Sequence, residues 1–216
     1  MNFVLEKRVN STISGVTCAA IFLIGTVSAC SGGGETSQPA PSTVAPPSTP
    51  PPASSANVMS ETDIIYGSGL VQNGAVNLLL DIYQPEGDCT DPRPFVIGIH
   101  GGGFTSGSKS SANWVDNMEA VAAAGFVGIS IDYRLVGDNP VVSAEFQPIA
   151  DDLQDEADRL ALTDTQRSVL NAAAAAFEDS SAALAWARDN ASARCLDIDR
   201  FAIWGSSAGA ITGLHI

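Results

Sequence analysis

The sequence predicts an α/β fold in which helices cover a mostly parallel sheet. Two apolar runs, residues 95–99 and 126–131, have the length of buried strands, and a helix is predicted between them. Buried strands joined by a helix are typical of parallel sheets that are covered on both faces. A further apolar run, residues 201–204, reads as a buried strand and passes directly into Gly-x-Ser-x-Gly and a helical segment. We therefore expect a folded domain over residues 59–216.

Two segments precede this domain. Residues 1–30 contain the charged Lys7 and Arg8 followed by an apolar stretch, which is the pattern of an export signal. That stretch is too short and too soon interrupted to predict a stable membrane span. Residues 31–58 are rich in Gly, Pro, Ser and Thr, a composition that cannot form a packed core and predicts a disordered tether.

Cys30 ends the sequence Val-Ser-Ala-Cys, which resembles a bacterial lipobox. The resemblance implies that Cys30 becomes the lipidated first residue of the mature protein. We would then expect an extracytoplasmic domain that the lipid anchors to a membrane of the bacterial cell envelope. Cleavage of an ordinary signal peptide near Ala29 is the alternative, but the cysteine and the tether that follows it favour lipidation.

Composition limits the classes of partner. The chain carries 24 acidic and 10 basic side chains, for a net charge of −14. This charge excludes nucleic acid, whose binding needs a basic surface, and we interpret the acid excess as favouring solubility. The two histidines and the absence of Cys-x-x-Cys predict no metal site. No cofactor is implied, and the oligomeric state is not indicated.

The strands before the first glycine motif form an antiparallel pair. Residues 63–66 and 76–83 are strand-like, and the Asn-Gly turn at residues 73–74 suits the connection between them. The next strands are those at residues 95–99 and 126–131.

The helices carry clear end signals. A first helix begins at Ser110 or Ser111 and ends near residue 124, because Gly125 occupies a C-terminal cap position. Residues 136–162 predict a loop and a short helix near the rim of the site, with its carboxylates in solvent. Thr163 and the glutamine three residues later predict the capping box of a long alanine-rich helix over residues 164–190.

Ser207 lies in the Gly-x-Ser-x-Gly sequence, which predicts a sharp turn between a strand and a helix. A strained turn needs small neighbours, and Gly205 and Gly209 provide them. The turn lifts the hydroxyl clear of the sheet at a helix N-terminus, where backbone N–H groups favour developing negative charge. A glycine-rich turn without chemistry is the alternative.

A second motif, His100-Gly101-Gly102-Gly103, closes the strand at residues 95–99. Three glycines after a strand allow the backbone to turn and direct N–H groups into a cavity. The tetrahedral intermediate of ester cleavage needs such donors for its oxyanion. The glycine motif and the serine motif point to the same chemistry, which favours the catalytic interpretation of Ser207 over a glycine-rich turn without chemistry.

With these two motifs the sequence resembles the α/β-hydrolase superfamily, in particular the carboxylesterase and hormone-sensitive-lipase-like branch with its bacterial feruloyl- or acetyl-esterase relatives. The resemblance covers about residues 62–216, and Asp-Tyr-Arg-Leu at residues 132–135 is part of it. It implies that Ser207 is the nucleophile, that the N–H groups of Gly102, Gly103 and Ala208 form the oxyanion hole, and that His100 and Gly101 support this loop. It also implies a small-molecule ester as substrate.

The same resemblance implies that part of the machinery is absent. In this family the acid and the base follow the serine on later strands, whereas this sequence ends nine residues after Ser207. His215 would lie about 12 Å along the following helix, beyond hydrogen-bond reach, and His100 suits a structural role. We therefore expect only strands one to five of the fold, a serine esterase in full-length form, and a fragment without useful activity here. A non-catalytic surface or binding protein is the alternative.

The resemblance further implies a disulfide between Cys89 and Cys195. Cys18 would leave with the signal and Cys30 would take the lipid, so these two thiols remain in an oxidising environment. Each lies six residues before the predicted start of a strand, and in this family those strands are parallel neighbours, about 4.8 Å apart. Two unpaired thiols are the alternative.

Overall fold

The computed structural model describes residues 57–216. The predictions of a signal at residues 1–30, of lipidation at Cys30 and of a tether up to residue 56 lie outside these residues, while Val58, the last residue of the predicted tether, belongs to a strand. The folded part begins with a strand at Val58, one residue before the predicted domain boundary. In chain order the elements are β1 (Val58–Val71), β2 (Gly74–Pro85), β3 (Arg93–Ile99), α1 (Ala112–Ala123), β4 (Val127–Ile131), η1 (Val136–Asp138), α2 (Gln147–Arg159), α3 (Asp164–Asp189), α4 (Ala191–Arg194), β5 (Leu196–Gly205) and α5 (Ala208–Gly213).

The five strands form one sheet in the order β1-β2-β4-β3-β5. The pairs β1–β2 and β2–β4 are antiparallel, and β3 is parallel to both β4 and β5. The sheet is therefore mixed, with its parallel part around β3. The crossover through α1 places β4 beside β3, and the chain then passes to the other side of β3 to form β5. This order and the turn after β5 make the structure the first five strands of an α/β-hydrolase fold.

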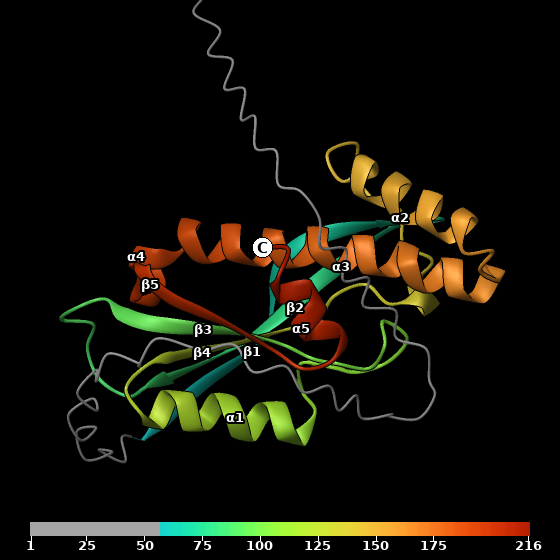
Figure 1. Cartoon of the computed structure of the whole chain (residues 1–216). Coiled ribbons are helices and arrows are strands. Elements are labelled where there is room, and N and C mark those ends of the chain that lie inside the picture. The colour runs from blue at the N-terminus through green and yellow to red at the C-terminus, as the bar shows by residue number, and fades with distance from the viewer. Residues whose placement is uncertain (1–56) are drawn as a thin grey trace, which may run out of the picture. The chain divides into compact units, whose positions relative to one another are not determined.

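Helices cover both faces of the sheet (Figure 1). Helix α1 packs against β2 and β4 on one face. On the other face α3 contacts β1 and β5, α5 contacts β5 and β3, and α2 packs against α3. The core lies between these layers, where Leu80, Ile97 and Ile129 of three neighbouring strands are fully buried. This core holds the carboxyl ends of β3, β4 and β5 together.

The predicted helix ends are close to those of the structure. Ser111 is the N-cap residue of α1, and Gly125, with φ of 93°, follows its end. Thr163 accepts a hydrogen bond from the Gln166 backbone N–H, and the Gln166 side chain accepts one from the Thr163 N–H, which completes the capping box of α3. Helix α2 has 13 residues and turns most of its carboxylates to solvent.

Strand β5 corrects one expectation, because residues 201–204 are not buried. Phe201 is 39% exposed and Trp204 is 42% exposed. Within the described residues β5 pairs only with β3, so its second edge and the side chains beside it are uncovered. An apolar run cannot by itself tell a central strand from an edge strand.

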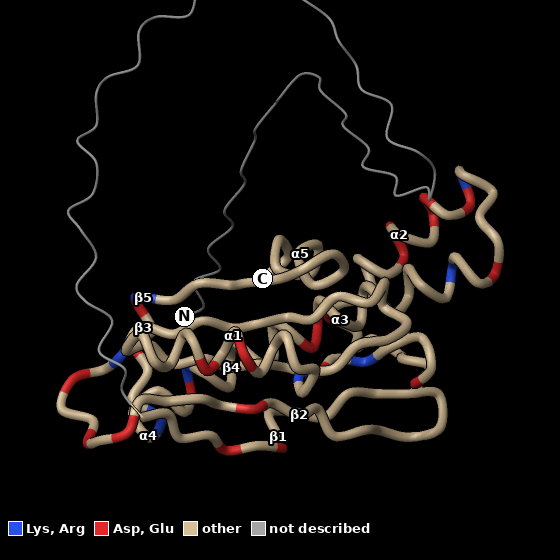
Figure 2. The backbone as a smooth tube through the Cα atoms, turned by 90° about the horizontal axis from the view of Figure 1, so that it is seen from below, with Lys and Arg blue, Asp and Glu red and all other residues tan. Residues whose placement is uncertain are grey.

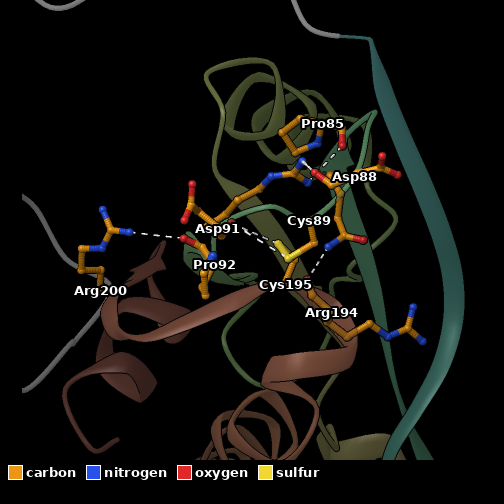
Figure 3. The surroundings of a disulfide bond; sticks show 10 residues. Pro85, Asp88, Cys89, Asp91, Pro92, Arg194, Cys195 and Arg200 are labelled. Atoms are coloured by element: carbon orange, nitrogen blue, oxygen red, sulfur yellow. Dashed lines mark hydrogen bonds between the residues drawn. A yellow bond between two sulfur atoms is a disulfide. The ribbon is translucent and has the colours of Figure 1, made fainter.

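A disulfide joins Cys89 to Cys195, as predicted, with their Cα atoms 5.7 Å apart. Figure 3 shows the bridge between the loop before β3 and the residue before β5. The backbone N–H of Arg93 donates to the carbonyl of Cys195 at 2.8 Å, so the two chain segments are also hydrogen-bonded here. The bridge lies at the amino ends of these strands, opposite the turn that carries Ser207.

Charged residues are spread over the described fold. Figure 2 shows acidic positions on α2 and on several loops, with basic positions among them. Among residues 57–216, no helix combines the length and the apolar character that crossing a membrane requires.

Candidate active site

Ser207 occupies the sharp turn between β5 and α5, with φ of 51° and ψ of −119°. Residues with a side chain seldom adopt this conformation, and it occurs mainly where the surroundings enforce it. A β-carbon on Gly205 would collide with the backbone of Gly209, and one on Gly209 would collide with the carbonyl of Ile99. Glycine is therefore required at both positions, as the sequence predicted. The turn leaves Ser207 exposed at the carboxyl end of the sheet.

The glycine loop lies directly against this turn. A β-carbon on Gly101 would be 2.8 Å from the carbonyl oxygen of Ser206 and 3.3 Å from Cβ of Ser207. Gly102 and Gly103 follow with φ of 115° and 62°. The carbonyl of Gly102 accepts hydrogen bonds from the backbone N–H groups of Thr105 and Ser106, at 3.1 and 3.2 Å. The structure thus brings the two motifs, about 100 residues apart in sequence, into one site.

The backbone N–H groups predicted to form the oxyanion hole, those of Gly102, Gly103 and Ala208, have no hydrogen-bond acceptor among the described residues. Ala208 opens α5, whose later N–H groups do bond to the turn, as when Ala210 donates to the carbonyl of Ser207 at 3.0 Å. Unpaired N–H groups are available to an anion, and they come from the two sides of the site.

His100 is buried beneath the glycine loop. Its Nδ1 lies 2.7 Å from the carbonyl oxygen of Gly101; a carbonyl only accepts, so Nδ1 carries the proton. The ring stacks on Tyr133 at 4.3 Å, and the Tyr133 hydroxyl donates to the His100 carbonyl at 2.9 Å. Burial lowers the pKa of His100, against the opposing effects of the Gly101 carbonyl and Asp132. The lowered pKa favours a neutral imidazole at pH 7, and the buried ring lies against the loop, where the predicted supporting role would place it.

Neither histidine of the chain is hydrogen-bonded to Ser207 in the structure. The Nε2 of His100 is buried, 3.7 Å from Asp132. Helix α5 ends at Gly213, so His215 lies beyond it rather than on it, with its ring stacked on Phe177 at 4.0 Å. The described residues thus bring together a serine and free N–H donors, without a general base in contact with them.

Sequence reasoning missed Lys109, which is buried in the loop that runs from the glycine motif to the start of α1. Its ammonium group contacts Asp81 and Asp63. A detectable signal was present, because Asp81 interrupts the apolar run of β2 and a buried carboxylate needs a partner. Two pockets of the described surface lie elsewhere, one beside Asn139 and Asn171, the other lined by Phe126 and Trp204.

Comparison with protein families gives one match, in which the family described as BD-FAE covers residues 80–155. This range includes the glycine loop and ends before Ser207.

Curated proteins of several kinds resemble the chain. Non-reducing polyketide synthase adrD of Penicillium rubens is 36% identical over 118 residues, which is 54% of this chain and 4% of the synthase. Acetylcholinesterase of Gallus gallus is 34% identical over 140 residues, 64% of this chain and 15% of that enzyme. The chain therefore spans a small part of the curated relatives that it matches.

Solved structures similar to this one include esterases. The Est2 esterase of Thermogutta terrifontis is 26% identical, with a TM-score of 0.46, 76% of this chain covered and 44% of that one. The esterase of Pyrobaculum calidifontis is 24% identical, with a TM-score of 0.43, 73% of this chain covered and 36% of that one.

Proposed function

We propose that the chain carries the nucleophile and the oxyanion hole of a carboxylic-ester hydrolase. The observation that carries this proposal is Ser207 on its strained turn, beside three N–H groups without an acceptor among the described residues. The BD-FAE match over the glycine loop supports it, as does the similarity to an enzyme named acetylcholinesterase. A binding module has no need of either feature.

In the proposed reaction, the Ser207 hydroxyl oxygen attacks the carbonyl carbon of a small-molecule ester. The carbonyl electron pair moves to the oxygen, which the N–H groups of Gly102, Gly103 and Ala208 stabilise. Collapse of this intermediate expels the alcohol and leaves an acyl group on Ser207, and water then releases the acid. No cofactor takes part.

Efficient attack also needs a base that accepts the hydroxyl proton. His100 shares its Nδ1 proton with Gly101 and His215 stacks on Phe177, so we assign the base to neither. We therefore propose that this chain alone turns over slowly, and that efficient turnover needs a base that neither histidine supplies. Since deacylation also needs the base, an acyl-enzyme formed from an activated ester is expected to accumulate.

The test uses p-nitrophenyl acetate, whose leaving group needs no proton. The full chain is incubated with the ester, and mass spectrometry of its peptides locates any acetyl group. We expect acetylation at Ser207, its loss in Ser207→Ala and its retention in Ser206→Ala, the matched control one residue away. Acetylation that survives Ser207→Ala would contradict the proposed nucleophile. Turnover near 10 per second, roughly the median for enzymes, would show that a base lies within this chain.

We also propose that the protein is exported and anchored to the cell envelope through lipid on Cys30. The support is the charged segment, the apolar stretch and Val-Ser-Ala-Cys before a Pro- and Ser-rich stretch. The disulfide between Cys89 and Cys195 is consistent with an oxidising compartment.

A further inference from the structure

We propose that Lys109 is a positioning residue, which fixes the loop between β3 and α1 so that the N–H groups of Gly102 and Gly103 can act as the proposed oxyanion donors beside Ser207. This inference rests on the proposed function, since it assigns those N–H groups to an oxyanion hole. Lys109 lies between the last glycine of the loop and the start of α1. It belongs to neither motif, and it does not touch Ser207 itself.

The backbone N–H and the carbonyl of Lys109 are both hydrogen-bonded to residues in β4 or directly after it. Its N–H donates to Asp132 Oδ1 at 2.6 Å, and its carbonyl accepts from the Ser130 hydroxyl at 3.0 Å. Ser130 is fully buried in β4, and Asp132 follows the end of that strand. The loop is thereby held against the carboxyl end of the strand next to β3.

The side chain of Lys109 reaches the opposite way, to the outer strands. Its Nζ donates to Asp81 Oδ1 of β2 at 2.6 Å and to Asp63 Oδ1 of β1 at 2.8 Å, with the Ser110 hydroxyl at 3.2 Å. Asp63 lies where the β1–β2 register shifts and has φ of 58°. Its own N–H donates to Asp81 at 2.9 Å. The register shift in β1 therefore lies where it lets the Asp63 carboxylate reach the Lys109 ammonium group.

The network is held together by charge. Burial alone lowers the pKa of Lys109, but its hydrogen bonds to Asp63 and Asp81 and the nearby Asp132 outweigh burial and raise it. Both Lys109 and Asp81 are almost completely buried, so removal of either leaves an uncompensated charge in the core. One lysine thus joins three strands to the loop.

The hydrogen bonds at the tip of the loop are internal to it, because the Gly102 carbonyl accepts only from Thr105 and Ser106 among the described residues. Gly102 and Gly103 are exposed, and glycine has wide backbone freedom. Gly107, with φ of 114°, packs against His100. Phe104 is buried and its carbonyl accepts from Val136 at 2.9 Å. This contact holds the middle of the loop, and Lys109 holds its end. Without Lys109 we expect the glycine N–H groups to sample a wider range of orientations.

The test uses the full chain with Ser207→Cys and compares two reactions of the new thiol. One reaction forms an oxyanion, and the other depends only on how accessible and reactive the thiol is. In acetylation by p-nitrophenyl acetate, the thiolate sulfur attacks the carbonyl carbon, an oxyanion forms, and p-nitrophenolate leaves. Alkylation by iodoacetamide displaces iodide and forms no oxyanion. Peptide mass spectrometry measures both rates at position 207, without reductant so that the disulfide stays closed. The ratio of acetylation to alkylation is the readout.

We expect Ser207→Cys to exceed the ratio of a short cysteine peptide. Adding Lys109→Met should lower the ratio roughly tenfold or more, since loss of one oxyanion donor typically costs a factor of 10² to 10³. Lys109→Arg should restore part of it. Arg167→Met, which removes an ion pair with Asp158 between α2 and α3, is the control for loss of a cation and should leave the ratio unchanged.

The outcomes distinguish the two proposals. A Ser207→Cys ratio equal to that of the peptide would contradict the oxyanion hole and with it the proposed function. A raised ratio that Lys109→Met leaves unchanged, in a protein of lowered melting temperature, would show that Lys109 is only structural. If Lys109→Met does not fold, Asp63→Asn decides, because the Asp63 side chain is 68% exposed and its loss leaves the other contacts in place. We expect a smaller decrease, and no decrease overturns the inference.

Discussion

At the scale of single residues, the site depends on backbone positions that only particular side chains allow. Ser207 combines a hydroxyl with a φ of 51°, a conformation that costs free energy and persists because its neighbours enforce it. Ile99 at the end of β3 contributes to this, since its carbonyl lies against Gly209 and accepts from the Ser206 N–H at 3.4 Å. The geometry of the Ser207 turn is therefore set by the packing of two glycines.

Gly209→Ala should disrupt this packing. The added methyl group would overlap the carbonyl of Ile99, and overpacking of this kind costs typically about 1–3 kcal/mol. We expect that loss in urea denaturation, together with loss of acetylation at Ser207. Gly137→Ala is the control, because a β-carbon there meets nothing within 4 Å. A Gly209→Ala variant as stable and as readily acetylated as the parent would argue against the packing constraint.

His100 should make the stability of the domain depend on pH. Its pKa in the folded protein is lowered from 6.5, chiefly by burial, so the unfolded chain binds its proton first as the pH falls. The stabilisation is complete above about pH 6.5 and is lost towards lower pH. Free energies of unfolding between about pH 8 and about pH 5 measure it. His100→Gln should flatten this dependence, and an unchanged slope would exclude His100 as its source.

At the scale of elements, β3 organises the site. It is parallel to β4 on one side and to β5 on the other, so the glycine loop, Asp132 and the serine turn all follow carboxyl ends of neighbouring strands. The disulfide fastens the amino ends of β3 and β5, where Cys89 and Cys195 are 106 residues apart in sequence. The strand pair is thus held at both ends.

Loss of the disulfide should destabilise the domain without changing the serine turn. For a loop of this length the chain-entropy model gives about 5 kcal/mol. Denaturation of the parent with and without reductant should show this difference, and the double variant Cys89→Ser with Cys195→Ser should respond to reductant no further. Alkylation of Cys89 and Cys195 by iodoacetamide in the denatured, unreduced parent would contradict the bridge.

At the scale of the whole molecule, the described sheet has two edge strands, β1 and β5, and the edge at β5 is apolar. Strand β5 has exposed Ile198, Phe201 and Trp204, and an uncovered apolar edge favours association with other strands. Two other features oppose such association. The acid excess makes copies of the protein repel one another, and the proposed anchor at Cys30 would hold each copy at a membrane surface.

The anchor makes a prediction for the exported protein. Mass spectrometry of the mature N-terminus should find lipid on Cys30, and the protein should fractionate with membranes. Cys30→Ser should move it to the soluble fraction, because the anchor would be lost. An unmodified N-terminus at another residue, in a soluble parent protein, would contradict lipidation.

Local signals in the sequence determined much of this fold. The capping box at Thr163, the glycine after α1 and the Gly-x-Ser-x-Gly turn were predictable because each depends on the conformations of a few adjacent residues. The two motifs indicated which side chains to examine. The disulfide and the neighbouring positions of β3 and β5 followed from the family resemblance, not from local pattern.

Only the tertiary structure decided the remaining features, because each depends on residues far apart in sequence. The exposure of β5 follows from which strand pairs with it, and an apolar run does not contain that information. The neutral state of His100 follows from its burial under the glycine loop. The role of Lys109 depends on a shifted register in β1, a carboxylate in β2 and the end of β4 meeting at one ammonium group. Charges pair through space, so the sequence specifies the residues and the fold determines which of them meet.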